Sequence, residues 1–146
     1  MPNRKASAVW EGGLKGGKGT FKGESGAIDG KYSFSSRFEE GTGSNPEELL
    51  AAAHATCFVT SLGSELARLG IPPERMHVNC TITMDEVEGQ GHRIVHSAIT
   101  ARAVVPGADE ATFAEAAAAA DGGCPFSALI RGTATVTYEA TLEGGS

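Results

Sequence analysis

The sequence predicts a single α+β domain over residues 1–146, with antiparallel sheets around one long helix. Two observations predict this class. Short alternating segments separated by glycine occupy the first quarter of the chain, and a helical period replaces them near Asn45. Two strand patterns, two helix patterns and a last strand pattern then follow. Strands and helices in separate runs are typical of the α+β class.

The first 38 residues predict a meander of three antiparallel strands. Apolar and polar residues alternate at 8–10, 19–21 and 32–35, and Arg37 follows the end of the third strand. Glycine-containing pairs that favour tight turns separate the segments. These pairs are Gly12-Gly13, Gly16-Gly17 and Asp29-Gly30.

A long helix is predicted from Pro46 to Leu69. Asn45 is a good N-cap, Pro46 suits the first helical position, and Glu48 can complete a capping box. Gly70 ends the helix. The helix is rich in alanine and other small residues, so we expect another helix or backbone to pack closely against it.

The second half of the chain predicts a hairpin, two helices and a last strand. Residues 78–84 alternate like a half-buried strand and pair with residues 93–105 across a glycine-containing turn. Helices are expected over residues 109–121 and 124–130, and a strand over residues 133–142. The glycines at the C-terminus predict a frayed tail.

Composition excludes several classes of protein. The chain is 40% hydrophobic and 21% charged, with 18 acidic and 12 basic residues. The net charge of -6 argues against nucleic acid and anionic membranes as partners. The most apolar stretch, residues 49–62, is too short to span a bilayer, and we expect no signal peptide. Three cysteines are an odd number in a chain of this size, so we expect a reducing, cytoplasmic environment.

The three cysteines lie in different local settings. Cys80 shares a face of its predicted strand with apolar residues, which predicts core packing. Cys124 follows two glycines and precedes a proline, which places it at a helix N-cap, where a thiolate is stabilised. Cys57 lies inside the long helix, where burial raises the pKa of a thiol unless the tertiary structure supplies a cation. Local physics therefore makes Cys124 the more acidic thiol.

Arg37 is a candidate for the missing cation, because it precedes the long helix by only a few residues. Glu47 lies in the first turn of that helix, where the helix dipole favours a carboxylate, and could hold the guanidinium by a bidentate pair. The alternative is that both are solvated surface charges. Sequence spacing does not decide between these interpretations.

His54 and Cys57 lie one helical turn apart and allow two further interpretations. His54 could act as a general base for Cys57, although a packed histidine is the commoner case. The two residues could also begin a zinc site, but closed zinc sites usually show two short ligand pairs and only one is present. We therefore expect no metal. The other possible ligands are Cys80, Cys124, His77, His92 and His96.

Several motifs extend over nearly the whole chain in a specific order. They are Trp10-Glu11-Gly12, Gly17-Lys18-Gly19-Thr20, Arg37-Phe38-Glu39, Asn45-Pro46-Glu47-Glu48-Leu49, Ala51-Ala52-Ala53-His54-Ala55-Thr56-Cys57-Phe58, Val105-Pro106-Gly107 and Gly123-Cys124-Pro125. In this combination they resemble the OsmC/Ohr family of thiol-dependent hydroperoxide reductases. The position of Arg37, and a lysine in the early glycine-rich turn, resemble the OsmC branch.

The resemblance implies an OsmC-like fold in an intertwined homodimer, with long central helices packed together and active sites at the subunit interface. It implies that Cys57 is the peroxidatic thiol, Cys124 the resolving thiol, Arg37 the group that polarises Cys57, and Glu47 the group that orients Arg37. Cys57 would attack the peroxide and become a sulfenic acid, and Cys124 would then form a disulfide with it.

The substrates implied by the resemblance are organic hydroperoxides, with hydrogen peroxide as a lesser one. A dithiol, such as a lipoyl group, would reduce the disulfide, and no cofactor is expected. Phe38 and Phe58 could line an apolar pocket or belong to the core. The alternative function is a non-catalytic module on the same scaffold that senses redox state or binds an apolar ligand.

Overall fold

The computed structural model describes residues 2–143, so the tail predicted at residues 144–146 lies outside the described residues. The chain divides into two units, residues 1–49 and residues 50–146. The boundary falls inside helix α2, Pro46–Arg68, which begins in the first unit and continues in the second. That the two units form one domain stays a prediction.

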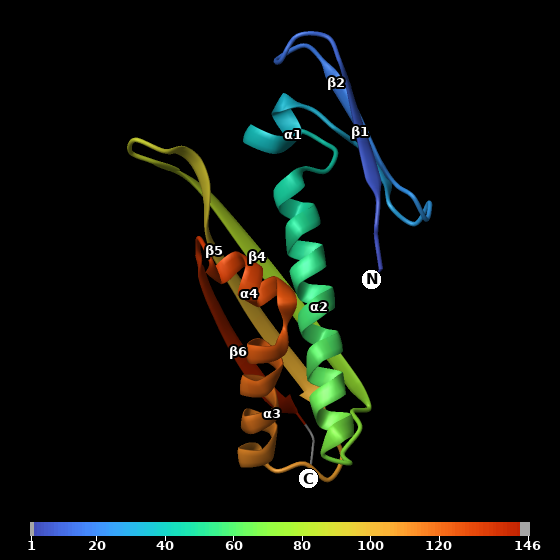
Figure 1. Ribbon diagram of the computed structural model, residues 1–146, viewed down its shortest axis with the longest axis vertical. Helices are drawn as coiled ribbons and strands as arrows, with labels where there is room; N and C mark the ends of the chain where they lie inside the picture. Colours follow the sequence, from blue (N-terminus) through green and yellow to red (C-terminus); the bar gives the residue numbers. More distant parts are fainter. Residues whose placement is uncertain (1, 144–146) are drawn as a thin grey trace. The chain divides into compact units, whose positions relative to one another are not determined.

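The first unit contains the predicted antiparallel meander. The strand order is β1-β2-β3, with antiparallel pairing throughout (Figure 1). The strands are β1, Ala6–Glu11; β2, Lys18–Gly23; and β3, Asp29–Tyr32. The prediction of three strands in this region is confirmed.

Aromatic rings and glycines alternate across this sheet. The Tyr32 ring centroid lies 5.4 Å from that of Trp10 and 6.1 Å from that of Phe21. A Cβ atom on Gly19 would lie 2.5 Å from the Tyr32 ring, and one on Gly30 would collide with the Phe21 ring. Both glycines are therefore needed because the neighbouring rings cover their backbone.

A short helix, α1, Phe34–Phe38, replaces the end of the predicted third strand, so that part of the prediction is wrong. Ser33 and Ser36 form a capping box, in which the Ser36 N–H donates to Ser33 Oγ at 3.1 Å and the Ser33 N–H donates to Ser36 Oγ at 2.8 Å. These local hydrogen bonds outweigh the alternating pattern. Arg37 consequently lies in the last turn of a helix.

Helix α2 begins as the sequence predicts. The Glu48 N–H donates to Asn45 Oδ1 at 2.7 Å, which confirms Asn45 as the cap. The Glu48 carboxylate does not close a capping box with Asn45; it accepts a hydrogen bond from the Ser44 hydroxyl at 2.5 Å.

The second unit contains a three-stranded sheet in the order β4-β5-β6. Strands β4 and β5 form the predicted antiparallel hairpin, but β6 pairs parallel with β5, so the prediction of purely antiparallel sheets is wrong. Two helices connect β5 to β6, and such a crossover brings the chain back in the same direction. The elements are β4, Arg75–Val87; β5, Gly91–Val104; α3, Glu110–Gly123; α4, Pro125–Arg131; and β6, Thr135–Glu143.

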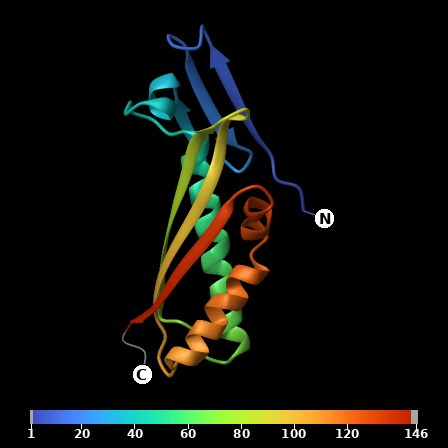
Figure 2. The ribbon, with the colours of Figure 1, turned by 90° about the vertical axis from the view of Figure 1, so that its left-hand side faces the viewer.

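Helices α2 and α3 lie on the same face of this sheet (Figure 2). One stripe of α2 enters the core with Phe58, Leu62 and Leu66, none of which is exposed to solvent. The stripe follows the i, i+4 spacing of a helix face. Cys80 packs against this core from β4, as its strand period predicts. The other core residues are Ile99, Ala101, Ala103, Val105, Ala108, Phe113, Ala116, Ala117 and Ala120.

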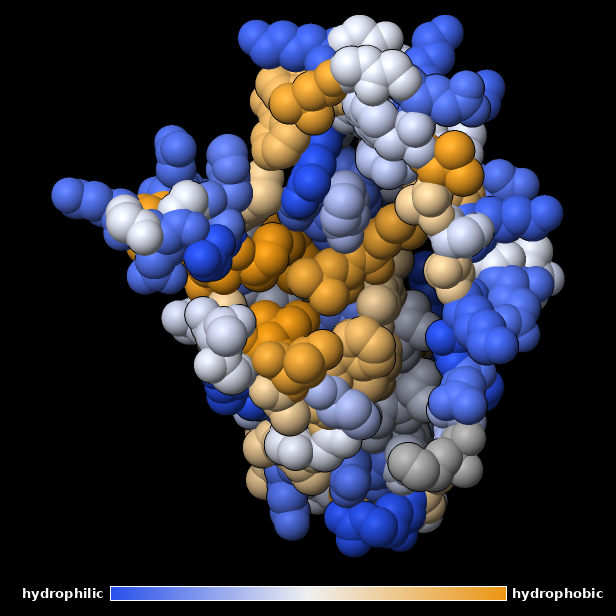
Figure 3. All heavy atoms as spheres, turned by 45° about the horizontal axis from the view of Figure 1, so that its top comes forward, coloured by the Kyte–Doolittle hydropathy of each residue, from blue (hydrophilic) through white to orange (hydrophobic). Residues whose placement is uncertain are grey.

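Much of α2 lies outside this core. Its most apolar 18-residue window has a mean hydropathy of 1.2, and 22% of that window is buried. By length and composition alone the helix could cross a membrane, a test that core helices of soluble proteins also pass. The absence of a membrane segment therefore stays a prediction. Figure 3 shows apolar side chains at the surface. Within the described residues, the large exposed apolar side chains are Val9, Leu14, Ile28, Phe38, Leu69 and Leu129.

We expect Leu62→Ala to lower the free energy of unfolding by about 2–5 kcal/mol, because it removes a fully buried side chain and leaves a cavity. Chemical denaturation at a fixed protein concentration measures this change. Leu69→Ala is the matched control, since 36% of Leu69 is exposed, and should cost much less. Equal losses in the two variants would contradict the assignment of Leu62 to the core.

Candidate active site

Two free cysteines meet in the second unit. Cys57 lies in the middle of α2, and Cys124 is the C-cap of α3 and the N-cap of α4. Their sulfur atoms are 3.0 Å apart although the residues are 67 positions apart in the sequence. Both are free thiols; Cys57 is partly exposed and Cys124 is fully buried. The structure therefore brings together the two cysteines that the sequence singled out.

Burial is the largest single influence on the pKa of Cys124 and raises it, but several hydrogen bonds together lower the pKa below its ordinary value. The lowering comes from the Cys57 thiol, from the hydroxyl and N–H of Ser127, and from the N–H of Phe126. The Ser127 N–H donates to Cys124 Sγ at 3.5 Å, as expected at a helix N-cap. This direction agrees with the sequence argument that Cys124 is the more acidic thiol.

The pKa of Cys57 shifts in the opposite direction. Burial raises it most, the contact with Cys124 raises it further, and the backbone N–H of Phe126 lowers it only in part. No cation is among the groups that shift this pKa within the described residues. A Cys57 thiolate therefore needs a positive charge in addition to these contacts.

Arg37 and Glu47 form an ion pair in the first unit. Arg37 Nε and Nη2 each lie 3.1 Å from the same Glu47 oxygen, Oε1, so the predicted bidentate pair is wrong. Glu47 Oε2 is buried and has no hydrogen-bond partner among residues 2–143. The Glu47 side chain is 14% exposed, so it is not the solvated surface charge of the alternative interpretation. The Arg37 guanidinium also lies 5.2 Å from the centroid of the Phe38 ring.

His54 is a packed histidine with both ring nitrogens occupied. Its side chain is fully buried, Nδ1 lies 2.6 Å from Ser97 Oγ, and Nε2 lies 2.8 Å from Ser127 Oγ. Burial lowers the pKa of His54; Asp121 opposes this shift and Arg131 adds to it. The ring bonds the two serines, which favours the packed interpretation over a base that acts directly on Cys57. No group of three or more metal-ligating side chains occurs within the described part of the chain.

The two phenylalanines lie in different units. Phe58 is fully buried in the core, where its ring centroid lies 6.0 Å from that of Tyr138. Phe38 is 39% exposed and belongs to the first unit. The core interpretation of Phe58 is therefore the correct one.

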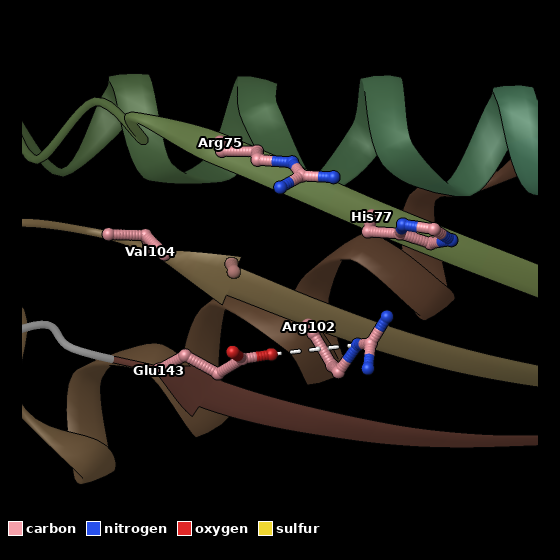
Figure 4. A pocket seen from close by; sticks show the side chains of 6 residues that line it. Arg75, His77, Arg102, Val104 and Glu143 are labelled. Atoms are coloured by element: carbon pink, nitrogen blue, oxygen red, sulfur yellow. Dashed lines mark ion pairs between the residues drawn. The ribbon is translucent and has the colours of Figure 1, made fainter.

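A cavity of about 180 Å³ lies on the second unit's sheet and contains none of the cysteines (Figure 4). The Arg102 Nε and Glu143 Oε1 atoms in it are 3.5 Å apart. The polar side chains that line it come from all three strands of the sheet and are Arg75, His77, Arg102 and Glu143. No cysteine lines this cavity, so the candidate site is defined by the contact between Cys57 and Cys124 alone.

Two free thiols in contact can be oxidised to a disulfide and reduced again. This α+β chain therefore belongs to the class of proteins with a redox-capable dithiol. The model of the OsmC-like protein family matches residues 39–139, and the chain therefore belongs to the OsmC family. It is 38% identical to Peroxiredoxin OsmC of Escherichia coli (strain K12), over 94% of this chain and 96% of that protein. It is 33% identical to the Organic hydroperoxide resistance protein of Xanthomonas axonopodis pv. citri (strain 306), over 66% of each chain.

Solved structures share this fold. The organic hydroperoxide resistance protein OhrB of Bacillus subtilis aligns with a TM-score of 0.72 and 23% identity, over 93% of this chain and 97% of that one. An OsmC-like protein of unknown function from Vibrio cholerae aligns with a TM-score of 0.77 and 16% identity, over 96% and 99%. These similarities confirm the predicted α+β, OsmC-like fold.

Sequence reasoning missed Ser97 and Ser127. Ser97 lies on β5 and Ser127 in the first turn of α4, and no motif marks either of them. Ser127 could have been found from its position three residues after the Cys124 cap, where its N–H must point at the sulfur.

The burial of His54 predicts a pH dependence of stability. Its pKa is lower in the folded protein than the ordinary value of 6.5, so the unfolded chain binds the proton more readily. The stabilisation is fully present above about pH 6.5 and is lost as the pH falls below it, by at most about 1.4 kcal/mol per pH unit.

We expect His54→Gln to remove this part of the pH dependence. The measurement is the free energy of unfolding between neutral and mildly acidic pH at a fixed protein concentration. His77→Gln, a change to an exposed histidine, is the matched control and should keep the wild-type slope. The same slope in His54→Gln as in wild type would show that His54 is not the group that titrates.

Proposed function

We propose that this protein is a thiol-dependent peroxidase that reduces organic hydroperoxides, with hydrogen peroxide as a lesser substrate. The observation that carries the proposal is the 3.0 Å separation of Cys57 Sγ and Cys124 Sγ. The reaction class is supported by two relatives, named Peroxiredoxin OsmC and Organic hydroperoxide resistance protein.

In the first step, Cys57 is the nucleophile. Its thiolate attacks one oxygen of the peroxide, the O–O bond breaks, and the leaving alkoxide takes a proton to become an alcohol. Cys57 is oxidised to a sulfenic acid while the peroxide is reduced by two electrons. Accessibility supports this role, because Cys57 is partly exposed whereas Cys124 is fully buried.

In the second step, Cys124 resolves the sulfenic acid. Its thiolate attacks the Cys57 sulfur, an S–S bond forms, the S–O bond breaks, and hydroxide leaves and becomes water. The lowered pKa of Cys124 suits this attack. The sulfurs need to approach by only about 1 Å to reach the ~2.05 Å length of a disulfide. A dithiol, such as a lipoyl group, then reduces the disulfide by thiol–disulfide exchange.

Arg37 supplies the positive charge that Cys57 requires, and Glu47 orients Arg37. The ion pair between their side chains supports the second role, because one carboxylate oxygen holds two nitrogens of the guanidinium. Glu47 lies in the first turn of α2, where the helix dipole stabilises its negative charge. The first role rests on the resemblance of the motif around Arg37 to the OsmC branch.

The working form is an intertwined homodimer in the cytoplasm, with active sites at the subunit interface and no cofactor. Two observations support a second copy of the chain. Only 22% of the most apolar window of α2 is buried, and this window is rich in small residues that permit close helix packing. Large apolar side chains such as Leu69 and Leu129 are also exposed.

Replacement of each cysteine should stop the cycle at a different step. Cys57→Ser should abolish turnover of an alkyl hydroperoxide with dihydrolipoamide as reductant, because the nucleophile is lost. Cys124→Ser should react once and then accumulate Cys57 sulfenic acid, which mass spectrometry detects after trapping with dimedone. Thr56→Ser, a conservative change at an exposed neighbour on α2, is the control and should keep wild-type turnover.

Two outcomes would contradict this assignment. One is thiol oxidation by peroxide that continues unchanged in Cys57→Ser. The other is a single stoichiometric oxidation of wild type without turnover under several dithiols, which would favour the redox-sensing alternative. Parallel assays with an alkyl hydroperoxide and with hydrogen peroxide determine the substrate preference.

Glu47→Gln should lower kcat/KM for an alkyl hydroperoxide about tenfold to hundredfold, because the guanidinium loses its charged partner and its fixed position. Glu48→Gln is the matched control, since Glu48 is the adjacent carboxylate on the same helix turn and bonds Ser44 rather than Arg37. Equal losses of kcat/KM in the two variants would show that Glu47 acts through the net charge or the stability of the helix and not through Arg37.

A further inference from the structure

The cavity on the second unit's sheet gathers positive charge. Residues 50–146 contain eleven acidic residues and five basic ones, and all five are arginines. Two of these arginines, Arg75 and Arg102, line the cavity of about 180 Å³ together with His77. Among the described residues that line it, Glu143 is the only acidic one. The wall of the cavity therefore carries an excess of positive charge, although the unit as a whole is negative.

The register of the sheet places these side chains in two adjacent rows. In one row, Val104 of β5 lies between Arg75 of β4 and Glu143 of β6. In the next row, His77 lies directly opposite Arg102. Residues two positions apart on a strand point to the same face of the sheet, and directly opposite residues are neighbours on that face. The four polar side chains therefore lie close enough together to contact one small ligand.

This face of the sheet is the one that the helices leave open. Met76 lies between Arg75 and His77 on β4 and packs against the core, which includes residues of helices α2 and α3. Because side chains alternate along a strand, Arg75 and His77 point away from that core. Figure 4 shows the Arg75 side chain extending along β4 toward His77. The cavity is therefore open to solvent.

Both guanidinium groups have donors to offer. Arg75 forms no hydrogen bond or ion pair with any other residue among positions 2–143. Arg102 Nε lies 3.5 Å from Glu143 Oε1, beyond the ~2.7–2.9 Å of a charge-assisted hydrogen bond, and the two side chains are 57% and 49% exposed. An exposed pair of this kind is weak. An anion can therefore reach both arginines without breaking a strong interaction.

The size and the donor pattern of the cavity favour a phosphate group. Its volume is below the ~300–1,000 Å³ of pockets that bury a drug-sized ligand, so it fits a small anion or the anionic end of a larger molecule. Donors come from three side chains on two strands, whereas a carboxylate offers only two oxygens. A phosphate group offers three strong acceptor oxygens, and guanidinium groups bind it with two parallel hydrogen bonds.

We propose that this cavity is a binding site for a phosphate group, either inorganic phosphate or the end of a phosphomonoester. Arg75 and Arg102 are its main ligands, and His77 is a third donor. Glu143 competes with the phosphate for Arg102 and lowers the affinity of the site. No cysteine lines the cavity, so this inference does not depend on the proposed peroxidase function.

The first experiment titrates the full, reduced chain with inorganic phosphate at constant ionic strength and follows the heat of binding. Wild type should show saturable binding at one site per chain. Arg75→Gln and Arg102→Gln should each weaken binding about tenfold, the effect of one lost charge-assisted hydrogen bond. Arg93→Gln is the matched control, because it removes the same charge from β5 outside the cavity. It should change the affinity less than about twofold, since distant exposed charges are screened.

The second experiment uses Glu143→Gln, which should strengthen phosphate binding about threefold to tenfold. The change removes a repelling carboxylate and releases Arg102 from its ion pair. A general loss of structure would weaken binding in every variant, so the opposite signs expected for Arg75→Gln and Glu143→Gln separate a site from misfolding.

The same titration with other anions identifies the source of the phosphate group. Tighter binding of phenyl phosphate than of inorganic phosphate would assign the site to the end group of a phosphomonoester. Binding of inorganic phosphate alone would assign it to the free anion. Acetate, a planar carboxylate of the same size class, should bind at least about tenfold more weakly, because it satisfies fewer donors.

Four outcomes would overturn the inference. They are the absence of saturable phosphate binding by wild type, an equal loss of affinity in Arg93→Gln and Arg75→Gln, weaker binding in Glu143→Gln, and acetate binding as tight as phosphate binding. The second of these would indicate a response to net charge alone.

Discussion

The contact between the Cys57 and Cys124 sulfurs depends on how α2 packs against the second sheet and α3. Cys57 immediately precedes Phe58, and Phe58, Leu62 and Leu66 fix the rotation and height of α2 in the core. Cys124 is held from the other side, because a single extended residue ends α3 and begins α4. A dithiol on these two elements is rigid because its supports are core elements, and close-packed cores resist small displacements.

The same contact gives the two thiols opposite acidities. Burial raises the pKa of Cys124, but hydrogen bonds with Cys57 and with the first turn of α4 lower it below the ordinary value. Cys57 lies in the middle of a helix, where the backbone N–H groups already donate to carbonyl oxygens of the preceding turn. Burial is therefore the largest influence on its pKa and raises it. The pair is therefore asymmetric: hydrogen bonds lower the pKa of one thiol, and burial raises the pKa of the other. That asymmetry suits the two-step reaction proposed above.

The sequence patterns predicted correctly the elements that depend on interactions between residues close together in the chain. The Asn45 cap, the β4–β5 hairpin and the helix cap at Cys124 all follow from residues within a few positions of one another. The strand predicted at Phe34 was wrong because two serines formed a capping box that competes with alternation. The parallel pairing of β6 was also missed, since strand direction depends on where α3 and α4 carry the chain.

From the sequence alone, the motifs indicated the OsmC family and predicted two pairs of site residues, Cys57 with Cys124 and Arg37 with Glu47. The structure shows each pair in contact. Only the tertiary structure decided what surrounds them. The partners of His54 are 43 and 73 residues away in the chain, so no local pattern could reveal that its two nitrogens bond Ser97 and Ser127. Hydrogen bonds between distant residues exist only after the core has packed, because packing removes the water that would otherwise satisfy each group.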